Sequence, residues 1–517
     1  MSKKMSRFSA AMLMTLFGMT KITHAETLRS VATVSDNWNF DPIDIDDIEK
    51  HELSDGLHAT LVEWDYNRNE IVAGLSSAFY WEGTNLFFKV RPGSKTSKGD
   101  LIKASDVVFS LQRAFLSGKN LIGNLHELLC SKPNSGKPKC DRIIAIDDNV
   151  IKLELPYRSP AFIDFLTAAN YGVVLEKNVD EKTNQIIDVS NTTGPYAVTV
   201  NNSSQFVLKA NKNHWQISTE NPTEIVFLRS PKNVDATDWS IEKIKKGDID
   251  YIGITPGFGY NDYKSLRDHF GEKASFHVSD EISVTKLNFT VRGMEIPVEI
   301  RQALSKVIQS TVDKKRHTLP SYKRATVEFT IPGSYGSFTK NNEDDLAKLR
   351  LSVNDNFSFG RKIILGVPDS SSKALMEKYL GPILEKIEIV VRDYSELTLA
   401  CQKLTKDSPD MIADSWDLGY VENFSAIALY VQRGTFWVRG RAADEWINKY
   451  MATEDSNKRL KMYRDLHVQS IATNPSVIPL WTTPYRAIAI NNWSLDSSSP
   501  NESVVHILNI KRKSKQR

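Results

Sequence analysis

The chain has 517 residues, of which 41% are hydrophobic, and this length predicts roughly three domains of about 150 residues each. Its 66 lysines and arginines nearly balance its 63 aspartates and glutamates. Residues 1–25 contain basic but no acidic side chains, so the rest of the chain is closer still to neutrality. This balance gives no electrostatic reason to expect nucleic acid or an anionic membrane as the main partner.

The first residues are ordered as in a secretory signal peptide. Basic residues come first, an apolar run from Phe8 to Met19 follows, and Thr23–Ala25 ends in a small residue. The apolar run is too short to cross a hydrocarbon core of ~30 Å, and no later run reaches the ~20 apolar residues that a span needs. We therefore predict a signal peptide at residues 1–25 and a periplasmic mature chain; a buried N-terminal helix is the alternative. No cysteine lies near the predicted cleavage site, so we expect no lipid anchor.

The chain has three cysteines, and two of them flank a short loop. Cys130 and Cys140 enclose residues 131–139, which are rich in proline, glycine and lysine. In an oxidising compartment we expect a disulfide here that contributes about 2 to 3 kcal/mol. Cys401 is then expected to be a small buried hydrophobe. A metal site with His126 is the alternative, but further ligands at suitable spacing are missing, and we expect neither a metal nor another cofactor.

Apolar periodicity predicts a strand followed by a helix in the first part of the chain. Between Leu86 and Arg91 apolar residues alternate along the chain, as in a strand with one face on a core. Ser105 is a suitable N-cap for the helix that follows, and Val108 and Phe115 fall on one face of that helix.

Further elements alternate between strands and helices. Turn-forming residues divide residues 142–155 and residues 196–209 into two predicted hairpins. Pro297 begins a predicted helix. A strand at 363–367, a helix at 373–384 and a strand at 387–391 form a predicted βαβ unit, which requires a parallel sheet. The sequence therefore predicts an α/β protein with at least two compact bodies.

The chain contains none of the common linear signatures of catalysis. It has no G-x-S-x-G elbow, phosphate-binding loop, dinucleotide fingerprint or H-E-x-x-H motif. Catalytic triads are set by geometry and escape such a search, so a secreted hydrolase remains an alternative. We predict that the protein is a binding protein and not an enzyme.

Several motifs in chain order resemble one family of receptors. The stretch Ala73–Arg113 contains Phe88–Gly93 and Gly99–Asp106, Thr193–Tyr196 reads T-G-P-Y, and Val298–Leu304 reads V-E-I-R-Q-A-L. These segments resemble the peptide, dipeptide and nickel class of periplasmic solute-binding proteins that serve ABC importers, extracellular solute-binding protein family 5. The resemblance extends over nearly all of the predicted mature chain.

The resemblance implies a type II periplasmic binding protein fold with two lobes and an additional subdomain inserted in the first lobe. It further implies a small-molecule or peptide ligand between the lobes, a membrane ABC permease as partner, and a monomer that does not bind nucleic acid. A sensor or scaffold protein not coupled to transport is the alternative. The expected division is a signal peptide at 1–25, lobe I at 26–285 with the inserted subdomain at about 63–187, lobe II at 286–475, and a C-terminal return into lobe I at 476–517.

The resemblance also indicates where ligand is bound. In the family a W-x-x-D-Y segment supplies an aspartate for the amino terminus of a peptide. The corresponding stretch here has Gly419 at the aspartate position, so another solute, such as a modified peptide, a sugar or an opine-like compound, is an alternative to a peptide. The expected ligand-binding residues are Trp416, Asp417, Gly419, Tyr420, Asn423, Asn37, Trp38 and His58.

Overall fold

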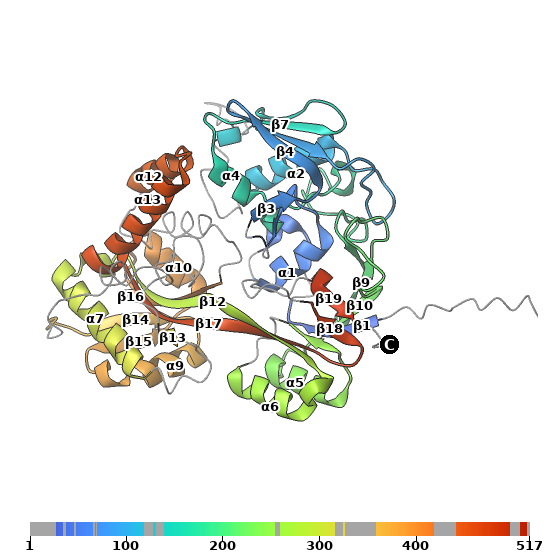
Figure 1. Ribbon diagram of the computed structural model, residues 1–517. Helices are drawn as coiled ribbons and strands as arrows, with labels where there is room; N and C mark the ends of the chain where they lie inside the picture. Colours follow the sequence, from blue (N-terminus) through green and yellow to red (C-terminus); the bar gives the residue numbers. More distant parts are fainter. Residues whose placement is uncertain are drawn as a thin grey trace, which may run out of the picture.

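The computed structural model describes twelve parts of the chain, and all statements below refer to these parts. They are residues 27–34, 38–45, 48–65, 68, 70–117, 128–130, 139–253, 259–315, 324–325, 358–417, 441–496 and 507–513. The predicted signal peptide lies outside them. Two bodies are joined by two long neighbouring strands (Figure 1).

The lobe I body is built on a mixed sheet of order β1–β10–β9–β8. Strand β1 runs parallel to β10, and β9 pairs antiparallel with both β10 and β8, which confirms the predicted hairpin at 196–209. Buried residues such as Leu28, Phe206 and Ile225 form its core with Leu53 and Leu57 of helix α1. The elements are β1 (Thr27–Ala32), α1 (Ile48–Leu57), β8 (Tyr196–Asn201), β9 (Gln205–Ala210), β10 (Glu224–Arg229), α5 (Ala236–Lys246), β11 (Tyr251–Ile252) and α6 (Tyr260–Phe270).

The inserted subdomain has an antiparallel sheet of order β4–β5–β7–β6 beside the β2–β3 hairpin. The predicted strand at 86–91 is β5, and the predicted hairpin at 142–155 is formed by β6 and β7. Cys130 and Cys140 are joined by a disulfide bond. The elements are β2 (Val62–Asp65), β3 (Glu70–Ala73), β4 (Ser76–Glu82), β5 (Asn85–Val90), α2 (Ala104–Leu116), β6 (Ile143–Ala145), β7 (Val150–Glu154) and α4 (Pro160–Phe165).

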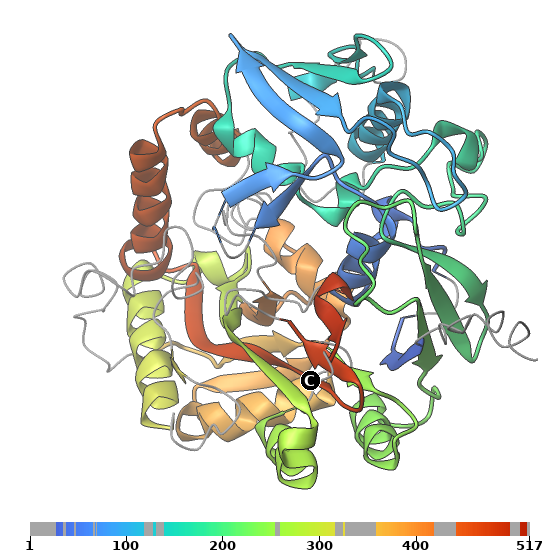
Figure 2. The same ribbon diagram turned by 45° about the vertical axis from the view of Figure 1, so that its right-hand side comes forward.

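The lobe II body contains a mixed sheet of order β11–β17–β12–β16–β14–β15, with β13 beside β17. Strands β14 and β15 are parallel, which confirms the predicted βαβ unit. Helices α7 and α9 pack on one face of this sheet, while Leu397 and Cys401 of α10 pack against Ile412 (Figure 2). The elements are β12 (Ser275–Phe289), α7 (Val298–Lys314), β13 (Arg324–Ala325), β14 (Ile363–Val367), α9 (Ser370–Leu380), β15 (Ile387–Val391), α10 (Tyr394–Gln402), β16 (Met411–Asp417), α12 (Arg441–Met451), α13 (Ser456–Val468) and β17 (Val477–Ala489). After β17 the chain forms β18 (Trp493–Leu495) and β19 (Ile510–Arg512), whose Trp493 and Ile510 lie in the core of lobe I.

Strands β12 and β17 form an antiparallel ribbon that crosses from one body to the other (Figure 1). Ala487 and Ala489 of β17 lie in the core of lobe I, whereas Ile478 lies in the core of lobe II together with Leu287 and Phe289 of β12. The register shifts three times between these ends, at 278/281, 281/283 and 285/286. Irregular pairing of this kind bends a ribbon locally. The lobe boundaries expected at 285/286 and 475/476 remain a prediction.

Two predicted helices start earlier than expected because acidic residues cap them. Helix α2 begins at Ala104, one residue before Ser105, since the Asp106 carboxylate accepts a hydrogen bond from the backbone N–H of Lys103 at 2.9 Å. Helix α9 begins at Ser370 because Asp369 accepts from the N–H of Ser372 at 2.7 Å. An acid at a helix start satisfies N–H groups that have no partner inside the helix.

The described helices include none that is long and apolar enough to cross a membrane.

Candidate functional site

Part of the predicted ligand-binding segment is the end of strand β16. Trp416 and Asp417 are its last two residues, and their backbones pair with Val284 and Ser283 of the crossing strand β12. The predicted binding segment therefore leaves the lobe II sheet directly beside the ribbon. Gly419, Tyr420 and Asn423 lie outside the described residues, as does Asn37.

A buried charged pair lies one step further along the same two strands. Lys286 of β12 is 1% exposed, and its ammonium nitrogen is 3.4 Å from a carboxylate oxygen of Asp414 on β16. The side-chain amide of Asn288 donates to the same carboxylate at 3.4 Å. Alternation along β16 puts position 416 on the sheet face that carries Asp414. The predicted segment thus begins next to a buried cluster of charged and amide groups.

This cluster retains capacity for a further hydrogen bond. In the described part of the chain, the side-chain oxygen of Asn288 is buried and has no hydrogen-bond partner. The hydrogen bond from the Asn288 amide nitrogen to the Asp414 carboxylate, at 3.4 Å, is longer than the ~2.8 Å of a strong charge-assisted bond. The Asn288 side-chain oxygen is therefore the acceptor in this cluster that could take a further hydrogen bond.

Trp38 and His58, the two described lobe I residues of the predicted site, are packed in the interior. Trp38 is 6% exposed, its ring lies 4.7 Å from that of Phe40, and it belongs to the core of lobe I. His58 is 4% exposed, and its Nε2 lies 2.9 Å from the carbonyl oxygen of Phe40. Burial lowers the pKa of His58, and the Phe40 carbonyl opposes this shift. The imidazole is thus neutral, and a ligand role for the two residues remains a prediction.

Residues that sequence reasoning missed include Lys286, Asp414 and Asn288. Their only signal was a charged lysine within Val284 to Phe289, a strand sequence that also contains Val284, Leu287 and Phe289. Partly buried aromatic side chains that pack against one core shared by both bodies were also left out of the predicted site. They include Trp81, Tyr157, Trp215, Trp446 and Tyr485.

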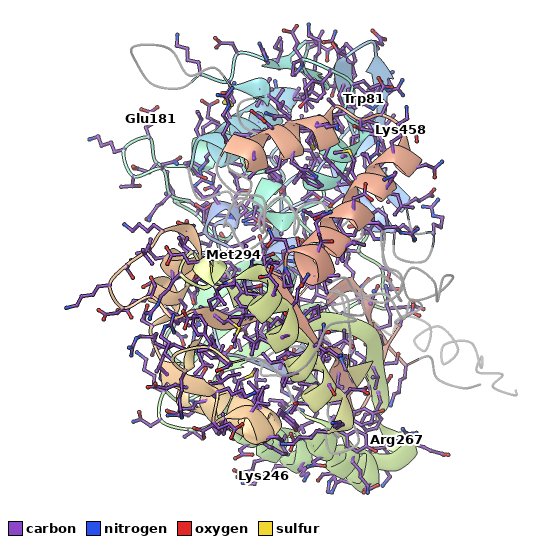
Figure 3. The ribbon with its side chains drawn as sticks, turned by 90° about the vertical axis from the view of Figure 1, so that its left-hand side faces the viewer. Trp81, Glu181, Lys246, Arg267, Met294 and Lys458 are labelled. Carbon is purple, nitrogen blue, oxygen red and sulfur yellow. A yellow bond between two sulfur atoms is a disulfide. The ribbon has the colours of Figure 1, made fainter. Side chains whose placement is uncertain are left out.

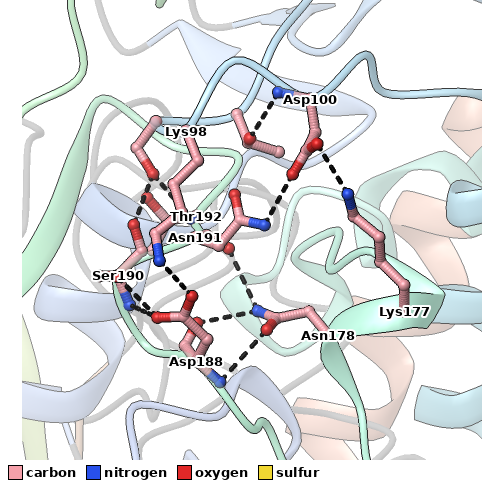
Figure 4. A network of polar contacts seen from close by, with 10 residues as sticks. Lys98, Asp100, Lys177, Asn178, Asp188, Ser190, Asn191 and Thr192 are labelled. Atoms are coloured by element: carbon pink, nitrogen blue, oxygen red, sulfur yellow. Dashed lines mark hydrogen bonds and ion pairs between the residues drawn. The ribbon is translucent and has the colours of Figure 1, made fainter.

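A family-like motif, Gly99–Asp100, is part of a polar network in the inserted subdomain (Figure 4). Asp100 accepts a hydrogen bond from the Asn191 amide at 2.9 Å and pairs with Lys177 at 2.7 Å. These two groups, Lys177 first, lower the pKa of Asp100. Lys98 and Asp188 form a second ion pair at 2.5 Å. The motif therefore joins one loop to another through side-chain contacts.

The T-G-P-Y motif likewise holds the scaffold together. The Thr193 hydroxyl donates to the carbonyl of Val173 at 2.6 Å and accepts from the N–H of Ala59 at 3.1 Å. The N–H of Gly194 donates to the carbonyl of Leu57 at 2.9 Å. These bonds join the end of α1 to the segments that enter and leave the inserted subdomain. The motifs that indicated the family are thus scaffold motifs.

Two other features of the described residues were considered as sites. No group of three or more histidine, cysteine, aspartate or glutamate side chains in these residues could hold a metal ion. A hollow of about 490 Å³ on lobe II lies between α10 and the loop that precedes β16, with Arg392 and Glu396 among its lining residues. It includes no predicted site residue, so we do not assign it to the site.

Two α/β lobes joined by a pair of crossing strands define the class of two-lobed binding proteins. A family model described as bacterial extracellular solute-binding proteins, family 5 Middle, matches residues 70–348, more than half of the chain. The protein therefore belongs to the extracellular solute-binding proteins of family 5, which confirms the resemblance seen in its motifs. A search among curated proteins found no match.

Solved structures share the fold over nearly the whole chain. NikA from Brucella suis, in complex with Fe(III)-EDTA, has a TM-score of 0.74 and 12% identity, covering 94% of this chain and 100% of that one. The murein tripeptide binding protein MppA of Escherichia coli has a TM-score of 0.70 and 16% identity, covering 95% and 99%. AgaA of A. tumefaciens R10, in complex with agropinic acid, has a TM-score of 0.67 and 16% identity, covering 94% and 99%. The expected two-lobed fold is confirmed.

Proposed function

We propose that this protein is the periplasmic substrate-binding component of an ABC importer. It binds a peptide or a peptide-like small solute between its two lobes, which close around the solute by hinge bending. The β12–β17 ribbon is the observation that supports this proposal. Its two strands connect two separate hydrophobic cores, and the register shifts in their pairing are places where a ribbon can bend. A ligand that contacts both lobes only when they are closed shifts the population toward the closed form.

The proposed site lies at the lobe II wall beside the ribbon. Trp416, Asp417, Gly419, Tyr420 and Asn423 are the proposed ligand-binding residues. The Lys286–Asp414 pair lies next to the start of this segment, which adds charged groups that sequence reasoning had not included. An aromatic and amide lining with a few fixed charges suits a small polar solute.

The class of solute follows from Gly419 together with the relatives. Glycine cannot supply the carboxylate that anchors a peptide amino terminus, so a solute held by other groups is favoured over a plain peptide. Related structures were solved with Fe(III)-EDTA and with agropinic acid, others with peptides, and another is named for a murein tripeptide. Because Gly419 lacks the anchoring carboxylate, we favour a modified peptide or an opine-like acid among these possibilities. The same proposal includes a monomeric, secreted protein without a lipid anchor and without catalytic activity.

Native mass spectrometry of gently purified protein tests this function. We expect a bound small solute of defined mass, and saturable binding of that solute by isothermal titration without its turnover. Turnover of the bound solute would instead favour the secreted hydrolase. If the protein binds the solute specifically but cells lacking the protein take up that solute normally, the sensor or scaffold is favoured.

A pair of variants locates the site. K286M/D414N removes both buried charges together, so that neither is left buried without its partner. We expect the affinity for the copurified solute to fall about tenfold or more, as for loss of a hydrogen bond to a charged group. K314M, at an exposed lysine of α7 in the same lobe, is the matched control and should leave the affinity unchanged. Equal affinity in the double variant and the control would place the ligand elsewhere.

A further inference from the structure

Helix α12 of the C-terminal half contacts helix α4 of the inserted subdomain. Ala443, Ile447 and Tyr450 recur at helical spacing along α12, and all of them are buried. They belong to one apolar cluster with Phe162 and Ile163 of α4. Figure 3 shows α12 and α13 face on. The two lobes therefore touch at a second place besides the crossing ribbon.

The contact contains buried apolar side chains from both helices. Phe162 and Ile163 of α4 and Ile447 of α12 belong to it, and apolar side chains attract one another without directional bonds. The Ser159 hydroxyl also lies 4.0 Å from the sulfur of Met451, and a thioether is a weak acceptor.

The other end of the same hairpin is fixed to lobe II by directional bonds. A guanidinium N–H of Arg301 on α7 donates to the Asn474 side chain at 2.6 Å, just beyond α13. The Gln302 amide donates to the carbonyls of Ala472 and Thr473 at 3.0 and 3.1 Å. The hairpin is thus tied to α7 by several polar bonds. If the lobes part, the hairpin therefore stays with lobe II, and the α4–α12 contact is the place where they separate.

We propose that the α4–α12 contact is a latch that sets how much of the protein is closed. The inference rests on the proposed hinge bending, and it adds that closure is stabilised by apolar contacts remote from the ribbon. A weaker latch lowers the closed fraction, and the apparent affinity for any solute that needs the closed form falls by the same factor. The latch therefore tunes affinity without touching the solute.

Distance measurements between spin labels on the two lobes test the latch. Labels at E181C in the inserted subdomain segment and at K314C on α7 report lobe separation, since both positions are exposed. The native cysteines do not compete, because Cys130 and Cys140 form a disulfide and Cys401 is buried. The labels are read out in the full mature protein, with and without I447A.

We expect I447A to raise the ratio of long to short distances between the two spin labels on the order of tenfold, because the open form becomes more populated. The matched control is I308A, the same truncation in the core of lobe II away from α4. It should lower thermal stability without changing the distances. If I447A does not fold, I163A on the other side of the contact serves as the same test. A loss of stability in I447A or I163A with an unchanged distance distribution would refute the latch.

The latch and the proposed function fail in different ways. A protein that binds no solute in mass spectrometry and titration would refute the proposed function. A protein that binds solute and changes its label distances on binding, but not on truncation at the contact, would refute the latch alone.

Discussion

Replacing Asp41 with alanine removes one half of a buried ion pair that joins the inserted subdomain to lobe I. Asp41 is 0% exposed, and it receives one guanidinium hydrogen bond from Arg113 of α2 at 2.8 Å and a second, shorter one. It also accepts from the N–H of Ile43 at 3.1 Å. Among the described residues, the variant leaves the buried guanidinium with its hydrogen bonds to Asn184, at 3.0 Å to the side-chain oxygen and 2.5 Å to the carbonyl oxygen. Leaving a buried charge without its partner lowers the free energy of unfolding by about 3–5 kcal/mol.

Urea unfolding followed by circular dichroism measures this loss. The control is D465A, whose partner Lys461 lies on the exposed surface of α13 at 2.6 Å, where an ion pair contributes about 0–1 kcal/mol. The double variant D41L/R113M replaces the pair by apolar side chains and should recover a large part of the loss. If D41A lowers the unfolding free energy no more than D465A does, the pair does not support the junction between the subdomain and lobe I.

Two further predictions concern pH and close packing. Burial, followed by the nearby charge of Glu49, raises the pKa of Glu52 to about 8, and burial raises that of Glu63 to about 7. Both carboxyl groups hold a proton more tightly in the folded protein than in the unfolded chain, where they titrate near 4.5. Their contribution to stability is therefore complete below pH 4.5 and is lost as the pH rises from there through 7 to 8. The melting temperature should therefore fall over this range, and E52Q should flatten the fall; an equally steep profile in E52Q would contradict it. In G194A, the new methyl group would overlap the backbone of Leu57, and we expect a loss of about 1–3 kcal/mol in urea unfolding. A G194A protein as stable as the parent would show that this close approach is not needed.

Local patterns in the sequence determined the elements and the family. The alternation at 86–91, the hairpins at 142–155 and 196–209 and the βαβ unit at 363–391 reappear in the structure, because each depends on residues close together in the chain. The sequence predicted helix starts less well, because an aspartate can cap a backbone N–H three residues away and so fix the residue at which the helix begins. The motifs that indicated the family were recognised because they hold the scaffold, as the hydrogen bonds of Thr193 illustrate.

Only the tertiary structure decided which distant residues meet. Asn288 and Asp414 are 126 positions apart, and Ser159 and Met451 are 292 apart, yet each pair is in contact. No local periodicity encodes such contacts, because they arise when separate sheets and helices pack together. The burial of His58 was likewise decided by packing in lobe I, where it is 4% exposed, and its ligand role stays a prediction. The sequence thus determined the kind of receptor, and the packing of its two lobes decided which residues meet at the proposed site wall and at the proposed latch.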